Sequence, residues 1–187
     1  TCNINDLGNE EFLFGAYCNP KGRVLATFRL FMMDDEIYMI CHHSIVRSFI
    51  DRLKMFVLRA DVAFHTRPDL AVVCWGQRDT LVRHPILSEY QTRSAWPQAC
   101  QGGSEPTKLA QLIITPIADA IDLIEQSGKD ITLLDSDYWN LLQIHHGVVS
   151  VTAASSNLFT PQNLNLDLIS SVSFTKGCYP GQEIVAR

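Results

Sequence analysis

Three apolar segments near the start of the chain are separated by short groups of turn-forming residues. They cover residues 12–18, 23–32 and 36–43. The tetrapeptide Asn-Pro-Lys-Gly at 19–22 separates the first two, with proline and glycine at the second and fourth positions of a turn. A pair of aspartates at 34 and 35 breaks the chain again. We therefore predict an antiparallel meander built from these segments.

An amphipathic helix is predicted after the meander, with Ser44 as its N-cap. Its apolar positions recur with helical spacing, at Ile45, Val46, Phe49, Ile50, Leu53, Phe56 and Val57. The segments 58–66 and 70–76 are predicted to be further strands. Strands covered by amphipathic helices are typical of an α+β domain, which is the fold class that the pattern predicts.

The second half of the chain has a different pattern. Residues 83–106 show no sustained period and many turn formers, which predicts a loop or inserted excursion. Thr115 and Pro116 are expected to be the N-cap and first residue of a helix that ends at Gly128. A second helix is expected over 138–146. The predicted division is a first α+β unit at 1–82, the excursion at 83–106 and a second α+β unit at 107–187.

Charge and hydropathy exclude some classes of protein. The 187-residue chain has a formal net charge of −5, whereas broad, non-specific binding of nucleic acid needs a dominant basic surface. We interpret its one local basic stretch as a solvated helix face; it holds Arg47, Arg52, Lys54, Arg59 and Arg67. No apolar run approaches the ~20 residues of a membrane span, so no membrane partner is expected. The chain does not begin with Met, and we expect it to be a piece of a longer protein.

The cysteines and histidines do not predict a metal site. The six cysteines include no CxxC pair, so a structural zinc or a cluster ligated by this chain alone is not expected. Several lie in apolar, strand-like runs, where a thiol is usually a small buried hydrophobe. The histidine pairs at 42–43 and 145–146 are adjacent in sequence, so their side chains diverge. A reducing, cytoplasmic setting fits this cysteine usage.

The segment KGCYPGQE at 176–183 holds the strongest candidate for chemistry. Gly177 permits unusual backbone angles, and Pro180 suits the first position of a helix. Cys178 is then expected just ahead of a helix N-terminus, where free N–H groups and the helix dipole favour an anion such as a thiolate. Lys176 adds positive charge nearby, and such surroundings are typical of reactive cysteines.

Two further interpretations belong to the same segment. Glu183 could hold a polar heterocycle by accepting N–H donors. Alternatively, Gly177 and Gly181 only shape a turn, and Cys178 packs beneath it.

The segment, read within SFTKGCYPGQEIVAR, closely resembles the signature of the YgfZ family of folate-binding proteins, relatives of the glycine-cleavage T-protein, an aminomethyltransferase. Three other segments are similar to that family: AYCNPKGRVLATFRLF, IYMICHHSIVRSFIDRLKMFVLRADV and LFTPQNLNLDLISSVSFTKGCY. The resemblance implies a fold of ferredoxin-like α+β units around a folate site, with a C-terminal barrel that this chain lacks.

The resemblance also implies a function. The family is thought to support iron–sulfur cluster assembly or repair, and methylthiolation of tRNA, in a manner that depends on tetrahydrofolate. The implied partners are folate and iron–sulfur enzymes or assembly proteins, while direct binding of tRNA stays open. The chain is expected to be an accessory protein rather than an enzyme.

The motif match implies which residues of this chain correspond to the functional site of the family. Cys178 is the implied functional thiol, and the residues that frame it are Lys176, Gly177, Tyr179, Gly181, Gln182 and Glu183. The candidates for lining the folate cavity are Asn19, Lys21, Gly22 and Arg23; Lys and Arg suit the carboxylates of a folate tail. Cys178 could ligate a cluster transiently, form a mixed disulfide or attack a folate-bound carbon. A four-iron cluster ordinarily takes four cysteines, so it would need a partner or a second copy.

Other functions remain as alternatives. One is a tetrahydrofolate-dependent one-carbon transferase of the T-protein type. The T-protein carries its catalytic carboxylate in the early hairpin, whereas the aligned positions here are Ala26 and Thr27, which cannot act as a carboxylate base. Glycine-cleavage activity is therefore not expected. The other is a scaffold whose cysteine only packs.

Overall fold

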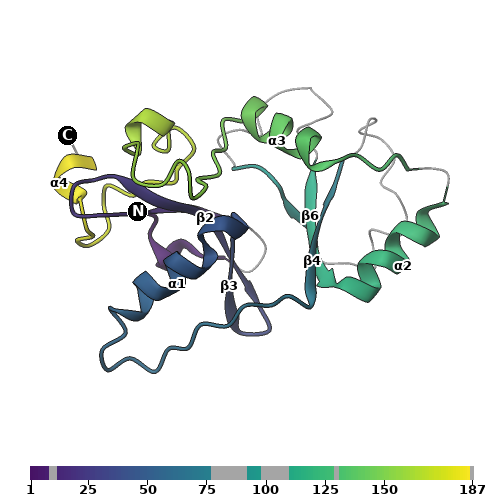
Figure 1. Cartoon of the computed structure of the whole chain (residues 1–187), viewed down its shortest axis with the longest axis horizontal. Helices are drawn as coiled ribbons and strands as arrows, with labels where there is room; N and C mark the ends of the chain where they lie inside the picture. The colour runs from purple at the N-terminus through teal and green to yellow at the C-terminus, as the bar shows by residue number, and fades with distance from the viewer. Residues whose placement is uncertain (9–11, 77–91, 98–109, 129–130, 186–187) are drawn as a thin grey trace. The chain divides into compact units, whose positions relative to one another are not determined.

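The computed structural model describes residues 1–8, 12–76, 92–97, 110–128 and 131–185 (Figure 1). The chain forms two compact units. Unit 1 contains Thr1–His65 and Gly147–Arg187, and unit 2 contains Thr66–His146. Each unit has a small antiparallel sheet and helices, so the predicted α+β class is confirmed.

The sheet of unit 1 is the predicted meander. Strands β1 (Leu13–Cys18), β2 (Val24–Met33) and β3 (Glu36–Cys41) pair in that order, and both pairs are antiparallel. Asp34 and Asp35 connect β2 to β3 with φ of 51° and 61°. Two successive residues with positive φ match the right-handed twist of the flanking strands, which is why such a tight hairpin turn is favoured here.

Helix α1 (Val46–Lys54) follows a 3-10 helix, η2 (His43–Ile45). Its Phe49 packs with Ala26 and Ile45 in a buried cluster, and Tyr17, Phe28, Cys41 and Leu53 border that cluster. The rings of Tyr17 and Phe28 each lie under 6 Å from the ring of Phe49, at 5.5 and 5.8 Å between centroids. The predicted amphipathic helix is therefore confirmed over Val46–Lys54, whereas the predicted apolar positions Phe56 and Val57 lie beyond its end and Phe56 is exposed.

The predicted cap of this helix is wrong. Ile45, not Ser44, is the N-cap of α1, because the 3-10 turn precedes the α-helix. The Ser44 hydroxyl oxygen instead accepts a 3.0 Å hydrogen bond from the backbone N–H of Ala153. The side chain thus connects the start of the helix to the C-terminal part of unit 1.

The predicted strand at 58–66 is also absent. These residues form no ladder, and all except Phe64 are exposed. Leu58 is 88% exposed and Val62 is 51% exposed. An apolar alternation forms a strand only where one face finds a core to pack on, and this segment has none.

The C-terminal part of unit 1 is mostly irregular chain bonded to β2. The Val24 N–H donates to Phe159 O at 2.8 Å, and the Asn157 N–H donates to Val24 O at 2.8 Å. Buried side chains hold this segment in place, among them Val151, Leu166 and Ile169. Besides η2, the described short helices of unit 1 include η1 (Ile4–Asp6), η7 (Gln162–Leu164) and α4 (Gln182–Val185).

Unit 2 has the strand order β4-β6-β5, all antiparallel. The strands are β4 (Leu70–Trp75), β5 (Thr92–Ser94) and β6 (Gln111–Pro116), and α2 (Ile117–Ser127) packs on β4 and β6 (Figure 1). Leu123 of α2 and Ile113 of β6 are buried at its centre. Helix α3 (Ser136–His145) completes the unit.

The two predicted helices of unit 2 differ from the structure only at their ends. Pro116 is the N-cap of α2 rather than its first residue, and Gly128 ends the helix with φ of 59°, as predicted. Helix α3 begins earlier than expected because the Asp135 carboxylate accepts a 3.1 Å hydrogen bond from the Tyr138 N–H and caps the helix.

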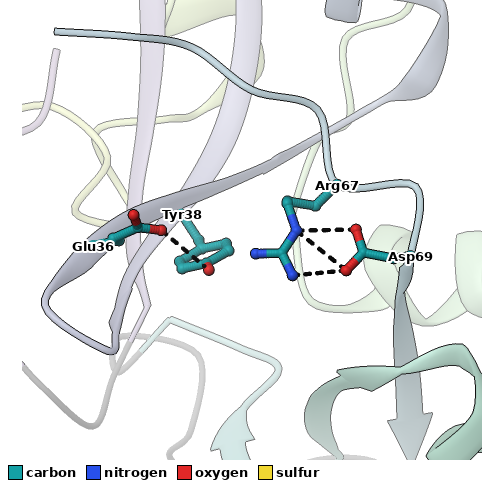
Figure 2. A network of polar contacts seen from close by, with 4 residues as sticks. All are labelled: Glu36, Tyr38, Arg67 and Asp69. Atoms are coloured by element: carbon teal, nitrogen blue, oxygen red, sulfur yellow. Dashed lines mark hydrogen bonds and ion pairs between the residues drawn. The ribbon is translucent and has the colours of Figure 1, made fainter.

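Some polar contacts join residues two positions apart in sequence. Figure 2 shows two of them: Tyr38 Oη lies 3.3 Å from Glu36 Oε2 in unit 1, and Arg67 Nη2 lies 2.7 Å from Asp69 Oδ2 in unit 2. Hydrogen bonding from Arg67 lowers the pKa of the Asp69 carboxyl. Arg67, one of the cations of the predicted basic stretch, is therefore paired with the Asp69 carboxylate.

The predicted boundaries at 82 and 107 stay a prediction, because most of the segment between them lies outside the described residues. None of the described helices has the length and apolar composition needed to cross a membrane.

Candidate functional site

Cys178 lies in irregular chain, and its thiol is exposed. The interpretation in which this side chain packs beneath a turn is therefore wrong. The helix that follows begins at Gln182 rather than at Pro180, and it is the four-residue α4. Its dipole is correspondingly small, so it gives little support to the predicted stabilisation of a thiolate.

Lys176 fixes the segment on one side of Cys178. Its ammonium donates a 2.6 Å hydrogen bond to Cys2 O and lies 5.4 Å from the centroid of the Tyr179 ring. Its backbone N–H donates to Ser173 Oγ at 3.2 Å. The side chain is half-buried, so the positive charge is held in place two residues before the thiol.

Tyr179 and Gln182 close a turn on the other side of Cys178. The Tyr179 N–H donates to Gln182 Oε1 at 3.3 Å, and the Gln182 N–H donates to Tyr179 O at 3.1 Å. Burial raises the pKa of the Tyr179 hydroxyl, and the Cys18 thiol adds to this shift.

Gly181 lies directly on the turn that joins β1 to β2. A Cβ atom at this position would be 2.5 Å from Asn19 O and 2.7 Å from the Cα and N atoms of Gly22. A Cβ at Gly22 would be 2.9 Å from Ile184 Cβ and Cγ2. Both glycines have positive φ, at 79° and 69°. The structure therefore brings together the two segments that the sequence singled out.

The side chain of Asn19 holds that turn in shape. Its Oδ1 accepts hydrogen bonds from the N–H groups of Lys21 and Arg23 at 2.9 and 3.0 Å. Its Nδ2 donates to Asn157 Oδ1 at 2.7 Å. Asn19 is thus a structural residue of the turn, and its polar atoms are occupied.

The charged candidate residues next to the contact between Gly22 and Gly181 are exposed. Lys21 and Arg23 both reach the surface from the turn, and Glu183 does so from α4. Arg23 is partly committed, because its Nη1 donates to Leu158 O at 2.7 Å. Gly177 has open space around it, with no atom within 4 Å of an added Cβ.

Sequence reasoning missed several residues that hold the site. Asn157 supports the turn through Asn19, and Gln162 Nε2 donates to Val185 O at 2.6 Å, which fixes the end of α4. Cys2 supplies the carbonyl that holds Lys176. The positive φ of 70° at Asn157 is a conformation that asparagine tolerates well, but the sequence alone does not mark which asparagine adopts it.

The hairpin positions Ala26 and Thr27, which are expected from the sequence to align with the T-protein carboxylate, are buried. Ala26 belongs to the core beneath α1. Thr27 Oγ1 accepts a 2.9 Å hydrogen bond from the Val151 N–H. Both positions therefore serve packing in this chain.

Within the described ranges, no group of three or more His, Cys, Asp or Glu side chains could hold a metal ion. The rings of His42 and His43 lie with centroids 4.4 Å apart and are tilted by 32°, and His42 Nδ1 lies 2.8 Å from Ser44 Oγ. This pair is part of the turn that starts η2.

Comparison with known proteins shows similarity along the whole chain. It is 28% identical over 202 residues to the tRNA-modifying protein YgfZ of Blochmanniella pennsylvanica, covering 100% of the chain and 59% of that protein. The same identity holds over 193 residues for the proteins of that name from Yersinia pestis (strain Pestoides F) and Yersinia pseudotuberculosis (serotype O:3), with 58% of each covered. The chain is thus similar in sequence to proteins named YgfZ along its whole length. The comparison along the whole of this chain thus supports the same family that the KGCYPGQE segment indicated.

No family model matches the chain. The chain spans 58–59% of the length of these curated YgfZ relatives.

Proposed function

We propose that this chain belongs to a protein that takes part in tRNA modification, with Cys178 as its functional thiol and a reduced folate as its cofactor. The observation that carries the proposal is the similarity along the whole of this chain to proteins named tRNA-modifying protein YgfZ, together with the exposed thiol in the matching signature.

The geometry supports a chemical role for Cys178. The chain is anchored before the thiol by Lys176 and after it by the turn from Tyr179 to Gln182, while the thiol itself stays exposed. A reactive group that is held in place but open to solvent can meet a ligand or another protein with little loss of conformational entropy. A cysteine that served packing alone would be buried instead.

The side chains around the thiol carry the chemical groups that could bind the two ends of a folate. A pterin ring offers N–H donors that a carboxylate such as Glu183 can accept, and a glutamate tail offers carboxylates that Lys21 and Arg23 can bind. These exposed groups come from the two segments joined at Gly22 and Gly181. Tetrahydrofolate, when bound, would supply a carrier of one-carbon units. The chain's own contribution would be to hold its charged ends and to present Cys178.

We further propose that the protein supports iron–sulfur enzymes or their assembly factors, as the resemblance implies. Cys178 is one exposed thiol, whereas a four-iron cluster ordinarily takes four cysteines. Cys2 and Cys18, two other cysteines of unit 1, are buried, and burial raises the pKa of the Cys18 thiol to about 11. A partner protein or a second copy would therefore complete any cluster site.

The proposal extends to the fold. The two α+β units would correspond to the ferredoxin-like units of the T-protein and YgfZ fold, and the remaining length of the relatives would include the C-terminal barrel. The three-stranded antiparallel sheets with packed helices support this assignment.

An aminomethyltransferase of the T-protein type is the alternative, but this chain has Ala26 and Thr27 where that activity would need a carboxylate. A direct assay for tetrahydrofolate-dependent release of ammonia from an aminomethyl donor separates the two functions. We expect no release above the rate without protein.

The decisive experiment uses a host strain from which the gene for its own YgfZ protein has been deleted. This protein is then expressed in that strain from its complete reading frame. Methylthiolated tRNA nucleosides are then quantified by mass spectrometry. We expect the unaltered protein to restore them and Cys178→Ser to fail at the same expression level. Cys74→Ser, which removes another exposed thiol in unit 2, is the matched control. Full restoration by Cys178→Ser would contradict the proposed role of the thiol.

A further inference from the structure

The contact between Gly22 and Gly181 is a contact between two backbones. The atoms that a methyl group at 181 would meet are Asn19 O and the Cα and N of Gly22, at 2.5 to 2.7 Å. Backbone atoms cannot swing aside as the end of a flexible side chain can. A residue with a Cβ at 181 would therefore push the two turns apart.

Cys178 is close to this contact along the chain. It precedes Gly181 by three residues, and consecutive Cα atoms are about 3.8 Å apart, so the two Cα atoms lie within about 11 Å. On its other side, the chain is tied through Lys176 to Cys2. A shift of the turn at 181 would be taken up by the short stretch between these anchors, which is the stretch that carries the thiol.

We propose that Gly22 and Gly181 are positioning residues that act through Cys178. Their backbone contact sets where the exposed thiol stands relative to the Asn19–Gly22 turn. The inference rests on the proposed function of Cys178, and it assigns to the β1–β2 turn a mechanical role in addition to any contact with a ligand.

Gly181→Ala tests the proposal, and Gly147→Ala is its matched control. Gly147 also lies in unit 1 and has a positive φ of 64°, but nothing lies within 4 Å of an added Cβ. Both variants suffer the backbone strain of alanine at positive φ, and only the first breaks the contact. The measurement is the alkylation rate of Cys178 by iodoacetamide as a function of pH, followed by mass spectrometry of the peptide.

We expect Gly181→Ala to change the Cys178 rate by about threefold or more, the scale of coupling between contacting residues. The rate should change because the thiol moves relative to the two anchors that flank it, at Lys176 and at the turn from Tyr179 to Gln182. Gly147→Ala should leave the profile unchanged. Cys2, which is buried with its Sγ next to Gly15, should stay unreactive in both variants and so report that unit 1 is folded.

A rescue variant covers the case in which Gly181→Ala does not fold. Gly22→Ala would meet Ile184 Cβ and Cγ2 at 2.9 Å, and Gly22→Ala with Ile184→Gly removes both of those atoms. We expect the single variant to shift the Cys178 profile and the double variant to move it back toward the original. An unchanged profile in every folded variant would overturn the proposal, as would a change that always appears together with Cys2 reactivity.

The outcome is separable from that of the proposed function. If Cys178→Ser abolishes tRNA modification but the alkylation profiles do not respond to Gly181→Ala or Gly22→Ala, only the positioning role fails. If the profiles respond but Cys178→Ser restores modification fully, the contact positions a thiol that the function does not need.

Discussion

The ammonium of Lys176 donates a 2.6 Å hydrogen bond to the carbonyl oxygen of Cys2, so the signature segment is tied to the first residues of the described chain. The same ammonium lies 5.4 Å from the centroid of the Tyr179 ring. This lysine, expected from the sequence to act as a nearby positive charge, also serves as an anchor for the backbone around Cys178.

Lys176→Met should therefore destabilise unit 1. A hydrogen bond from a charged group is worth about 1.5–3 kcal/mol, and the half-buried position lowers the expected loss to about 1 kcal/mol. Native-state hydrogen exchange of the amides in β1 measures this loss within unit 1. Lys54→Met, which removes an exposed cation from α1, is the control and should leave exchange unchanged. Equal exchange in both variants would show that the anchor contributes nothing.

Cys18 should make the stability of unit 1 depend on pH in the alkaline range. Burial raises the pKa of its thiol from 9.0 to about 11. The folded state therefore holds this proton more tightly than the unfolded state. The resulting stability is fully present below about pH 9 and is lost as the pH rises through 11.

The measurement compares the unaltered chain with Cys18→Ala by urea unfolding at several pH values. The advantage of the unaltered chain in free energy of unfolding should shrink by about 2–3 kcal/mol between pH 8 and 11, at ~1.4 kcal/mol per pKa unit. Cys74→Ala removes an exposed thiol and should not alter the pH dependence. A constant difference between the unaltered chain and Cys18→Ala across this range would refute the prediction.

Leu123 should be the most sensitive position of α2. It is fully buried against Ile113, and Trp75 packs on the same cluster. Leu123→Ala should cost about 2–5 kcal/mol through lost burial and the cavity left behind. Tryptophan fluorescence during urea unfolding follows unit 2 because Trp75 borders the cavity. Ile121→Ala, on the exposed side of the same helix, should cost less than about 1 kcal/mol.

The local features of the fold could be predicted from the sequence. The β1–β2–β3 meander follows from apolar segments separated by turn chemistry, and helix α1 follows from the spacing of its apolar residues. Both depend on residues close together along the chain. The segment 58–66 shows the limit of such reasoning, because its alternation resembles a strand while its side chains stay exposed.

The contacts that build the candidate site could not be predicted in the same way. The sequence marked KGCYPGQE and the Asn19–Gly22 turn separately, yet nothing in either pattern states that Gly181 lies on Gly22. The bonds from Asn19 to Asn157 and from Lys176 to Cys2 also join segments that are far apart in sequence. Such contacts depend on how the whole unit packs, which local propensity does not encode.

Unit 1 is discontinuous in sequence, and this has a consequence for synthesis on the ribosome. All residues of unit 2, Thr66–His146, have been added before the second half of unit 1 begins at Gly147. Unit 2 can therefore complete its fold during translation, since domains generally fold as they are made. The β1–β2 turn must wait with its backbone uncovered until Gly181 is translated. The candidate segment at 176–183 can therefore assemble only after unit 2 has been made, and chaperones would meet unit 1 in its unfinished form.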